Sequence, residues 1–136
     1  MEKHKGKHIL LDVITKNEET CLNDKEMLKL IAQAAEEAGA NVINQVRYRF
    51  GHNSPPGFTC VVVLDESHIS CHAYADTRQL AFDFFTCGNT DPADAVKIVL
   101  KNIEFESIIE KEFDRFSWKI IKLLELFIDI VLLIFL

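Results

Sequence analysis

The side chains best suited to chemistry lie in one short stretch of the chain, which contains Glu66, Ser67, His68, His72 and Cys87. A serine hydroxyl is a latent nucleophile, a thiol is both a nucleophile and a proton donor, and a histidine exchanges protons near neutral pH. Each residue alone also has an ordinary explanation, because cysteines often fill apolar cores and strand histidines are often satisfied polar groups. Their joint spacing is what indicates chemistry.

The same stretch has the pattern of a β-hairpin, with strands over residues 68–74 and 80–86 around the turn 75–78. A turn centred on Thr77 places Ser67 opposite Cys87, within about 5.5 Å across the strand pair, and His72 opposite Phe82. His72 then lies about 17 Å from Ser67 along an extended strand. This geometry predicts a hydroxyl and a thiol at one end of the hairpin. It excludes His72 from the Ser67 site of its own chain but leaves it able to serve the site of a partner chain.

Val61–Ser70, His72 and Phe85–Gly88 resemble the short prokaryotic class of S-adenosylmethionine decarboxylase. The resemblance runs from Gly6 to about Arg115, most of the chain. A Glu-Ser-His triplet alone is a weak signal, whereas the triplet with a downstream histidine and a Phe-Thr-Cys-Gly block at matching spacing is specific. The resemblance implies a self-processing enzyme in which the bond before the serine breaks and the serine becomes a covalent pyruvoyl cofactor.

The resemblance also implies a role for each residue. Ser67 Oγ attacks the carbonyl of Glu66, which turns the amide into an ester, and His72 is the base for the elimination that follows. Thr59 matches a serine that assists processing and keeps its hydroxyl. In turnover, the substrate amine forms a Schiff base with the pyruvoyl ketone and carbon dioxide leaves. Thiols in general are mostly protonated at neutral pH, and the resemblance makes Cys87 the group that then donates a proton to the carbanion.

The substrate that the resemblance implies is S-adenosylmethionine, whose decarboxylated product donates aminopropyl groups for spermidine synthesis. Phe50 matches the position whose ring stacks on the adenine, with core packing as its ordinary alternative. Asp76 replaces a glutamate that is expected to hold the ribose hydroxyls, in a segment that departs from the family pattern Thr-Trp-Pro-Glu. This departure keeps open an ornithine or arginine decarboxylase on the same scaffold. An unprocessed, non-catalytic binding or regulatory homologue is a further alternative, which the intact catalytic set disfavours.

Composition sets the broad limits. The chain has 136 residues, 49% of them hydrophobic, and a net charge of −6, which predicts one packed domain and argues against nucleic-acid binding. The four cysteines lack paired spacing and no secretory signal is recognised, so we expect reduced thiols in a cytoplasmic protein. The histidines lack a metal-ligand pattern, and no metal site is expected.

The hydrophobic periodicity predicts an α+β fold. Strands are expected over 9–14, 41–50, 58–64, the two hairpin arms and 104–112, with helices after the N-caps Asn23 and Asp91. Two helices on one face of a mainly antiparallel sheet make a two-layer sandwich. The other sheet face needs a cover, and a second subunit is one candidate. The resemblance likewise implies a homodimer of processed αβ protomers, with each site drawing on both.

The segment 116–136 departs from the family pattern and divides the chain into a decarboxylase domain over 1–115 and a hydrophobic C-terminal helix or tail. A thin polar stripe at helical spacing runs through this tail, formed by Lys119, Lys122, Glu125 and Asp129. A helix packed on the core or a partner and a weakly membrane-bound surface helix are both open readings. A spanning helix fits less well because of the charges, and a shifted reading frame is a further alternative.

Overall fold

The computed structural model describes residues 6–115. Its elements, in chain order, are β1 (Lys7–Thr15), the short 3₁₀ helix η1 (Glu19–Cys21), α1 (Asp24–Glu37), β2 (Val42–Phe50), β3 (Gly57–Leu64), β4 (Ser67–Tyr74), β5 (Gln79–Thr86), α2 (Pro92–Asn102) and β6 (Phe105–Asp114). The predictions for the tail 116–136 fall outside the described residues. Within them, no helix has the length and apolar character needed to cross a membrane.

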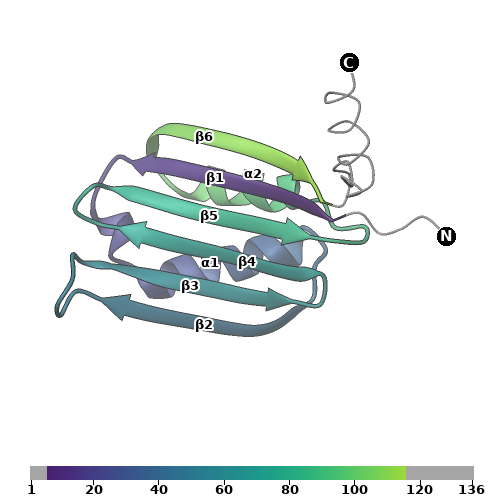
Figure 1. Cartoon of the computed structure of the whole chain (residues 1–136), viewed down its shortest axis with the longest axis horizontal. Helices are drawn as coiled ribbons and strands as arrows, with labels where there is room; N and C mark the ends of the chain where they lie inside the picture. The colour runs from purple at the N-terminus through teal and green to yellow at the C-terminus, as the bar shows by residue number, and fades with distance from the viewer. Residues whose placement is uncertain (1–5, 116–136) are drawn as a thin grey trace, which may run out of the picture.

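Six antiparallel strands form one sheet in the order β2-β3-β4-β5-β1-β6, and both helices lie on the same face of it (Figure 1). The two-layer α+β prediction is therefore confirmed. Each helix begins at its expected cap, because the Asn23 side chain accepts from the Glu26 N–H at 3.4 Å and the Asp91 side chain accepts from the Ala93 N–H at 3.0 Å. Gly39, with φ +90°, follows the end of α1 in a backbone conformation that favours glycine.

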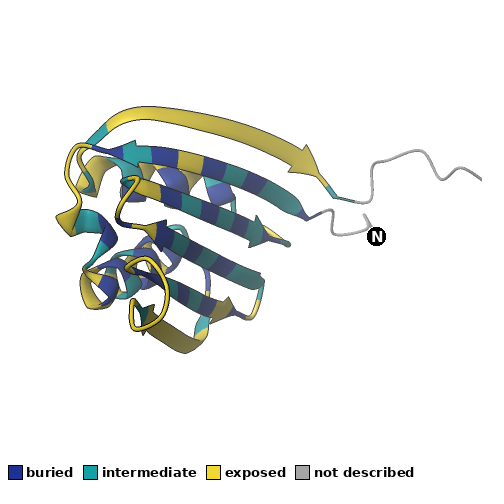
Figure 2. Cartoon of the chain, turned by 60° about the vertical axis from the view of Figure 1, so that its left-hand side comes forward, coloured by how far each residue is buried: buried dark blue, intermediate teal, exposed yellow. Residues whose placement is uncertain are grey.

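The core lies between the sheet and the helices, and it is built by strand alternation. Ile69, Cys71 and Ala73 of β4 are fully buried, while the residues between them are more exposed, which gives the banded strands of Figure 2. Phe82 and Phe84 of β5 continue the buried layer with stacked rings 5.6 Å apart.

The other face of the sheet, which we call the open face, carries exposed apolar side chains. They are Val46 (59% exposed), Tyr48 (69%), Val63 (43%), Tyr74 (45%), Ile109 (63%) and Phe113 (38%). The strand register puts them on the same face as His68 and His72, whose neighbours along β4 point into the core. The open face thus combines apolar surface with both hairpin histidines.

The register predicted for the hairpin is wrong by one residue. Ser67 pairs with Thr86, not Cys87, and His72 pairs with Ala81, not Phe82. The turn Ala75–Arg78 has four residues, with Arg78 at φ +56°, so its centre lies between Asp76 and Thr77. A left-handed arginine is uncommon, and nothing in its residue type reveals it.

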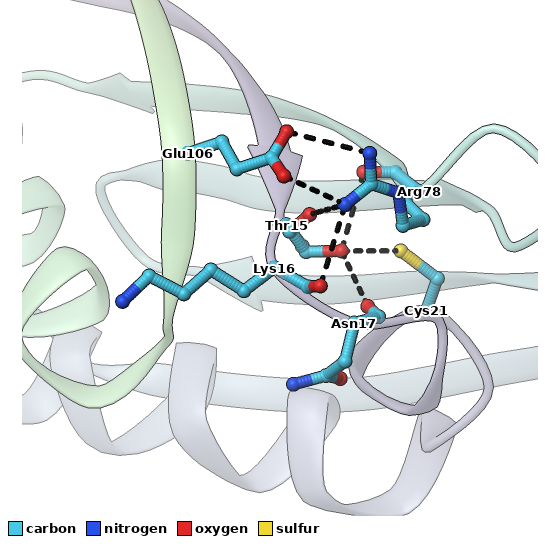
Figure 3. A network of polar contacts seen from close by, with 6 residues as sticks. All are labelled: Thr15, Lys16, Asn17, Cys21, Arg78 and Glu106. Atoms are coloured by element: carbon cyan, nitrogen blue, oxygen red, sulfur yellow. Dashed lines mark hydrogen bonds and ion pairs between the residues drawn. The ribbon is translucent and has the colours of Figure 1, made fainter.

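Contacts to β1 and β6 hold this turn in place (Figure 3). The Arg78 guanidinium donates to the carbonyl oxygens of Thr15 (3.1 Å) and Lys16 (3.3 Å), and it forms a two-pronged contact with the Glu106 carboxylate at 3.0 and 3.3 Å. In return, Thr15 Oγ1 and the Thr15 N–H donate to the Arg78 carbonyl oxygen at 3.2 and 2.8 Å. The hairpin tip that carries Asp76 is therefore held by the end of β1, the strand next to β5, and by β6 beyond it.

Candidate active site

The bond between Glu66 and Ser67 lies in a tight turn. Leu64 pairs with Ser67, so only Asp65 and Glu66 connect β3 to β4. Ser67 has φ +147°, a region that residues with a Cβ rarely occupy and in which a backbone is strained. The turn is tethered because the Asn41 N–H donates to Glu66 Oε2 and the Asp65 N–H donates to the Asn41 carbonyl oxygen, both at 2.9 Å. The strained residue is therefore Ser67, directly after the Glu66–Ser67 peptide bond.

Cys87 holds the carbonyl oxygen of Glu66 with two donors. Its backbone N and its Sγ each lie 3.0 Å from that oxygen, and both donate a hydrogen bond to it. Two donors aimed at a carbonyl oxygen polarise the carbon and stabilise the negative charge that develops when a nucleophile attacks it. The hydroxyl and the thiol do meet at one end of the hairpin, although the thiol contacts the carbonyl before Ser67 instead of lying across from Ser67 itself.

Cys87 is also the accessible thiol of the chain. Cys21, Cys60 and Cys71 are buried, and burial raises the pKa of each, in the case of Cys60 to about 12. Thiols of this kind stay protonated and inert. Cys87 is only partly buried, so it alone among the four is placed to meet a substrate.

His68 contacts Ser67, which the sequence alone did not lead us to expect. Its Nδ1 lies 3.3 Å from Ser67 Oγ. Burial lowers the pKa of His68, and the nearby His8 and Arg115 lower it further, while Asp83 opposes them. Adjacent strand residues normally point to opposite faces of a sheet, and the unusual φ of Ser67 is what lets these two side chains meet. The one sequence signal was their adjacency in the Glu-Ser-His triplet.

A second cluster lies further along the open face. Thr59 and His72 are directly opposed on β3 and β4, and Thr59 Oγ1 lies 2.7 Å from His72 Nδ1. The Phe50 ring stacks on the His72 ring with centroids 5.3 Å apart, and the Tyr74 ring meets it edge-on at 4.5 Å. The structure therefore brings together Phe50, Thr59 and His72, three of the residues selected from the sequence, and adds Tyr74.

Gly57 makes the Phe50 arrangement possible. A Cβ at this position would lie 2.1 Å from the Ala73 carbonyl oxygen and 2.8 Å from Phe50 Cε2. A cleft of about 560 Å³ opens beside the Phe50 ring, lined by residues 48–54 and Pro56. Asp76 lies exposed in the hairpin turn, two residues beyond Tyr74. None of the described contacts joins its carboxylate to the aromatic cluster.

The two clusters form separate half-sites on one chain. We call Glu66, Ser67, His68 and Cys87 the junction half-site, and Phe50, Thr59, His72 and Tyr74 the aromatic half-site. Ser67 and His72 are five residues apart on β4, about 17 Å at the rise of an extended strand. The predicted separation of His72 from the Ser67 site of its own chain therefore holds in the structure, despite the shifted register.

Comparison with known proteins identifies the family of the chain. Residues 7–116 match the family model for S-adenosylmethionine decarboxylase. A Methanococcus aeolicus protein named "S-adenosylmethionine decarboxylase proenzyme" is 34% identical over 110 residues, which cover 78% of this chain and 92% of that protein. A protein of the same name from Methanococcus maripaludis (strain C5) is 35% identical over 114 residues, covering 83% and 91%.

The fold has a solved counterpart as well. The crystal structure of the adenosylmethionine decarboxylase from Aquifex aeolicus superposes with a TM-score of 0.74 at 25% sequence identity, covering 88% of this chain and 98% of that one. On its motif, its fold and its sequence relatives, the chain belongs to the S-adenosylmethionine decarboxylase family.

Proposed function

We propose that the chain is a proenzyme that cleaves itself between Glu66 and Ser67 and then decarboxylates S-adenosylmethionine. The observation that carries the proposal is the junction half-site, where the Glu66 carbonyl accepts two hydrogen bonds from Cys87 beside the Ser67 hydroxyl. Family membership supports the substrate. The product, decarboxylated S-adenosylmethionine, would supply aminopropyl groups for spermidine synthesis.

The groups at the junction support self-cleavage by the following steps. Ser67 Oγ attacks the Glu66 carbonyl carbon, the C–N bond breaks, and the Glu66 acyl group passes to the hydroxyl as an ester, leaving a free Ser67 amine. A base then removes the Ser67 α-proton, and the Glu66 carboxylate departs to leave dehydroalanine. Addition of water and loss of ammonia convert this residue to a pyruvoyl group. The β chain would end at Glu66, and the α chain would begin at residue 67.

His72 is the base that we assign to the elimination, and it must come from a second copy of the chain. The separation of about 17 Å on one strand rules out the His72 of the same chain. Thr59 Oγ1, 2.7 Å from Nδ1, orients the imidazole. In a twofold dimer that pairs the open faces, each junction half-site can meet the aromatic half-site of the partner. Such a dimer would also cover the exposed apolar side chains of the open face.

The residues present also fit the chemistry of turnover. A ketone at position 67 supplies an electrophile for the substrate amine and a sink for the electrons left when carbon dioxide departs. Cys87 remains beside that position and can return the proton, which requires a reduced thiol and fits a cytoplasmic location. Phe50, stacked on His72 beside the open cleft, offers a flat ring for adenine. We assign to Asp76, in the turn held by Arg78, the role of binding the ribose hydroxyls.

The alternatives are not favoured. The relatives reported above carry the name of S-adenosylmethionine decarboxylase, and a paired aromatic surface suits a nucleoside better than a small basic amino acid. The complete junction half-site argues against an unprocessed regulatory homologue.

The test of the proposed function is a denaturing mass spectrum of the purified protein, followed by carbon dioxide release from carboxyl-labelled substrates. We expect two fragments split at Glu66–Ser67, the second carrying a pyruvoyl mass at its N-terminus, and release from S-adenosylmethionine but not from ornithine or arginine. A single chain that persists on long incubation would refute self-processing. Release from ornithine or arginine alone would refute the substrate.

Replacing Cys87 should separate cleavage from turnover. We expect Cys87→Ala to cleave on the order of 10-fold more slowly, because the backbone N–H still holds the Glu66 carbonyl and a thiol is a weaker donor than those whose loss costs 10²–10³. Turnover of the processed fraction should fall by about 100-fold with the loss of the proton donor. Cys87→Ser is the matched control, since its hydroxyl restores the hydrogen bond but is a poor acid. Full turnover in Cys87→Ala would refute the donor role.

A further inference from the structure

The contact between Ser67 and His68 has no role in the chemistry described so far. Self-cleavage includes two proton removals, one from the serine hydroxyl when it attacks and one from the Ser67 Cα in the elimination. The His72 of the same chain lies too far along β4 to serve the first, and the partner's His72 is assigned to the second. Cys87 is occupied as a donor, because its Sγ–H points to the Glu66 carbonyl oxygen. His68 Nδ1 lies 3.3 Å from Ser67 Oγ, and it can accept the hydroxyl proton when the neutral ring carries its own proton on Nε2.

We propose that His68 is the base that takes the Ser67 hydroxyl proton in the first step of self-cleavage, so that two histidines from two copies of the chain divide the work. This inference rests on the proposed function. The Oγ–H proton passes to Nδ1 while Oγ bonds to the Glu66 carbonyl carbon. When the C–N bond breaks, the same imidazolium returns the proton to the departing Ser67 nitrogen. His68 therefore acts first as base and then as acid, and no other reactant is needed.

The surroundings of His68 keep its ring neutral and fixed. The Phe85 ring packs edge-on against it, with centroids 5.8 Å apart. Three charged or titratable groups face it from neighbouring elements: Asp83 on β5, His8 on β1 and Arg115 after β6. His8 Nε2 lies 3.0 Å from Asp83 Oδ1, which engages the carboxylate that would otherwise favour a charged His68. Val63, paired with His68 on β3, adds no charge.

These groups together determine how the rate of the acyl shift should depend on pH. Burial is the largest influence and lowers the pKa of His68. A histidine with a lowered pKa stays unprotonated, and so able to accept a proton, further into the acid range than an ordinary histidine with a pKa of about 6.5. The rate of the acyl shift should therefore fall only below pH 6.5.

The experiment isolates the first step by blocking the second. In a His72→Ala background the ester should accumulate, and saturating hydroxylamine should cleave it into a fragment ending in a Glu66 hydroxamate and a fragment beginning with Ser67. Mass spectrometry at intervals gives the rate of ester formation. Adding His68→Ala should slow that rate by about 100-fold, within the range for a lost general base, and imidazole in the buffer should restore part of it.

His68→Asn is the matched control, because its side-chain oxygen can accept the Ser67 hydrogen bond but cannot take the proton near neutral pH. We expect His68→Asn/His72→Ala to be as slow as the alanine variant and to lose the acid limb of the pH profile. An ester rate equal to that of His72→Ala alone would overturn the role of His68 while leaving self-cleavage intact.

The remaining outcomes also decide the question. The wild-type protein could cleave while the His72→Ala variant forms no ester. That result would make His72 the base for the first step and overturn the proposal. A wild-type protein that never cleaves would overturn this proposal and the proposed function together. The pH profile of His72→Ala needs no change at position 68, so it decides the matter even if the His68 variants fail to fold. Absence of an acid limb there would also overturn the proposal.

Discussion

Ser67→Ala should leave the protein as one uncleaved chain without decarboxylase activity. The substitution removes the hydroxyl of the residue that follows Glu66, so neither the ester nor the pyruvoyl group can form, although the Cys87 N–H and Sγ–H still hold the Glu66 carbonyl. Denaturing mass spectrometry should give the full-length mass, and labelled S-adenosylmethionine should release no carbon dioxide above background.

Ser70→Ala is the control for this experiment. It removes a second β4 serine, three residues from the junction, and should cleave and turn over like the wild type. Cleavage in Ser67→Ala would mean that a different bond or nucleophile is used, and activity without cleavage would mean that the cofactor does not arise from Ser67.

Two inactive variants should rescue each other when they are produced in one cell. Ser67→Ala has a defective junction half-site and an intact aromatic half-site, and the reverse holds for His72→Ala. A mixed dimer pairs the intact Ser67 of one chain with the intact His72 of the other, which makes one complete site out of two. Random assembly makes half of the dimers mixed, so about a quarter of the wild-type activity should return. The readout is cleavage of the His72→Ala chain alone, together with carbon dioxide release.

The control pair is Ser67→Ala with Cys87→Ala, since both changes damage the same half-site. Each mixed dimer then has one site without Ser67 and one without Cys87, and activity should not rise above that of Cys87→Ala alone. If both pairs regained activity, sharing of half-sites between chains could not be the cause of the rescue. Failure of the first pair, with mixed dimers demonstrated by affinity tags, would refute the shared site.

Periodicity and capping were enough to predict the elements and the layer arrangement. Asn23 and Asp91 begin helices because their side chains satisfy free N–H groups, and the alternating apolar residues of β4 and β5 define which face is buried. The hairpin register was missed because it depends on the backbone of Arg78, at φ +56°. A turn with a left-handed glycine could have been recognised, whereas a left-handed arginine held by Thr15, Lys16 and Glu106 depends on tertiary contacts.

The features of the site that depend on strand geometry were predictable, and those that depend on an unusual backbone angle or on tertiary contacts were not. The meeting of the hydroxyl and the thiol follows from the hairpin, and the separation of His72 from Ser67 follows from strand rise alone. The contact of His68 with Ser67 was not predictable from strand alternation, because the φ of Ser67 breaks that alternation. The stacking of Phe50 on His72 joins strands that are not neighbours in the sheet, so it was not predicted. The family resemblance singled out Phe50 only as a ring for adenine.

The strand order has a consequence for the mature protein. The predicted cut divides the chain into β1, α1, β2 and β3 on one side and β4, β5, α2 and β6 on the other, yet β1 lies between β5 and β6. Strands of the two products therefore alternate in one sheet. Three strand pairs join one fragment to the other: β3–β4, β5–β1 and β1–β6. Neither fragment can leave without opening the sheet in its middle. We therefore expect folding to precede cleavage, and the two fragments to stay together in one sheet until the protein is denatured.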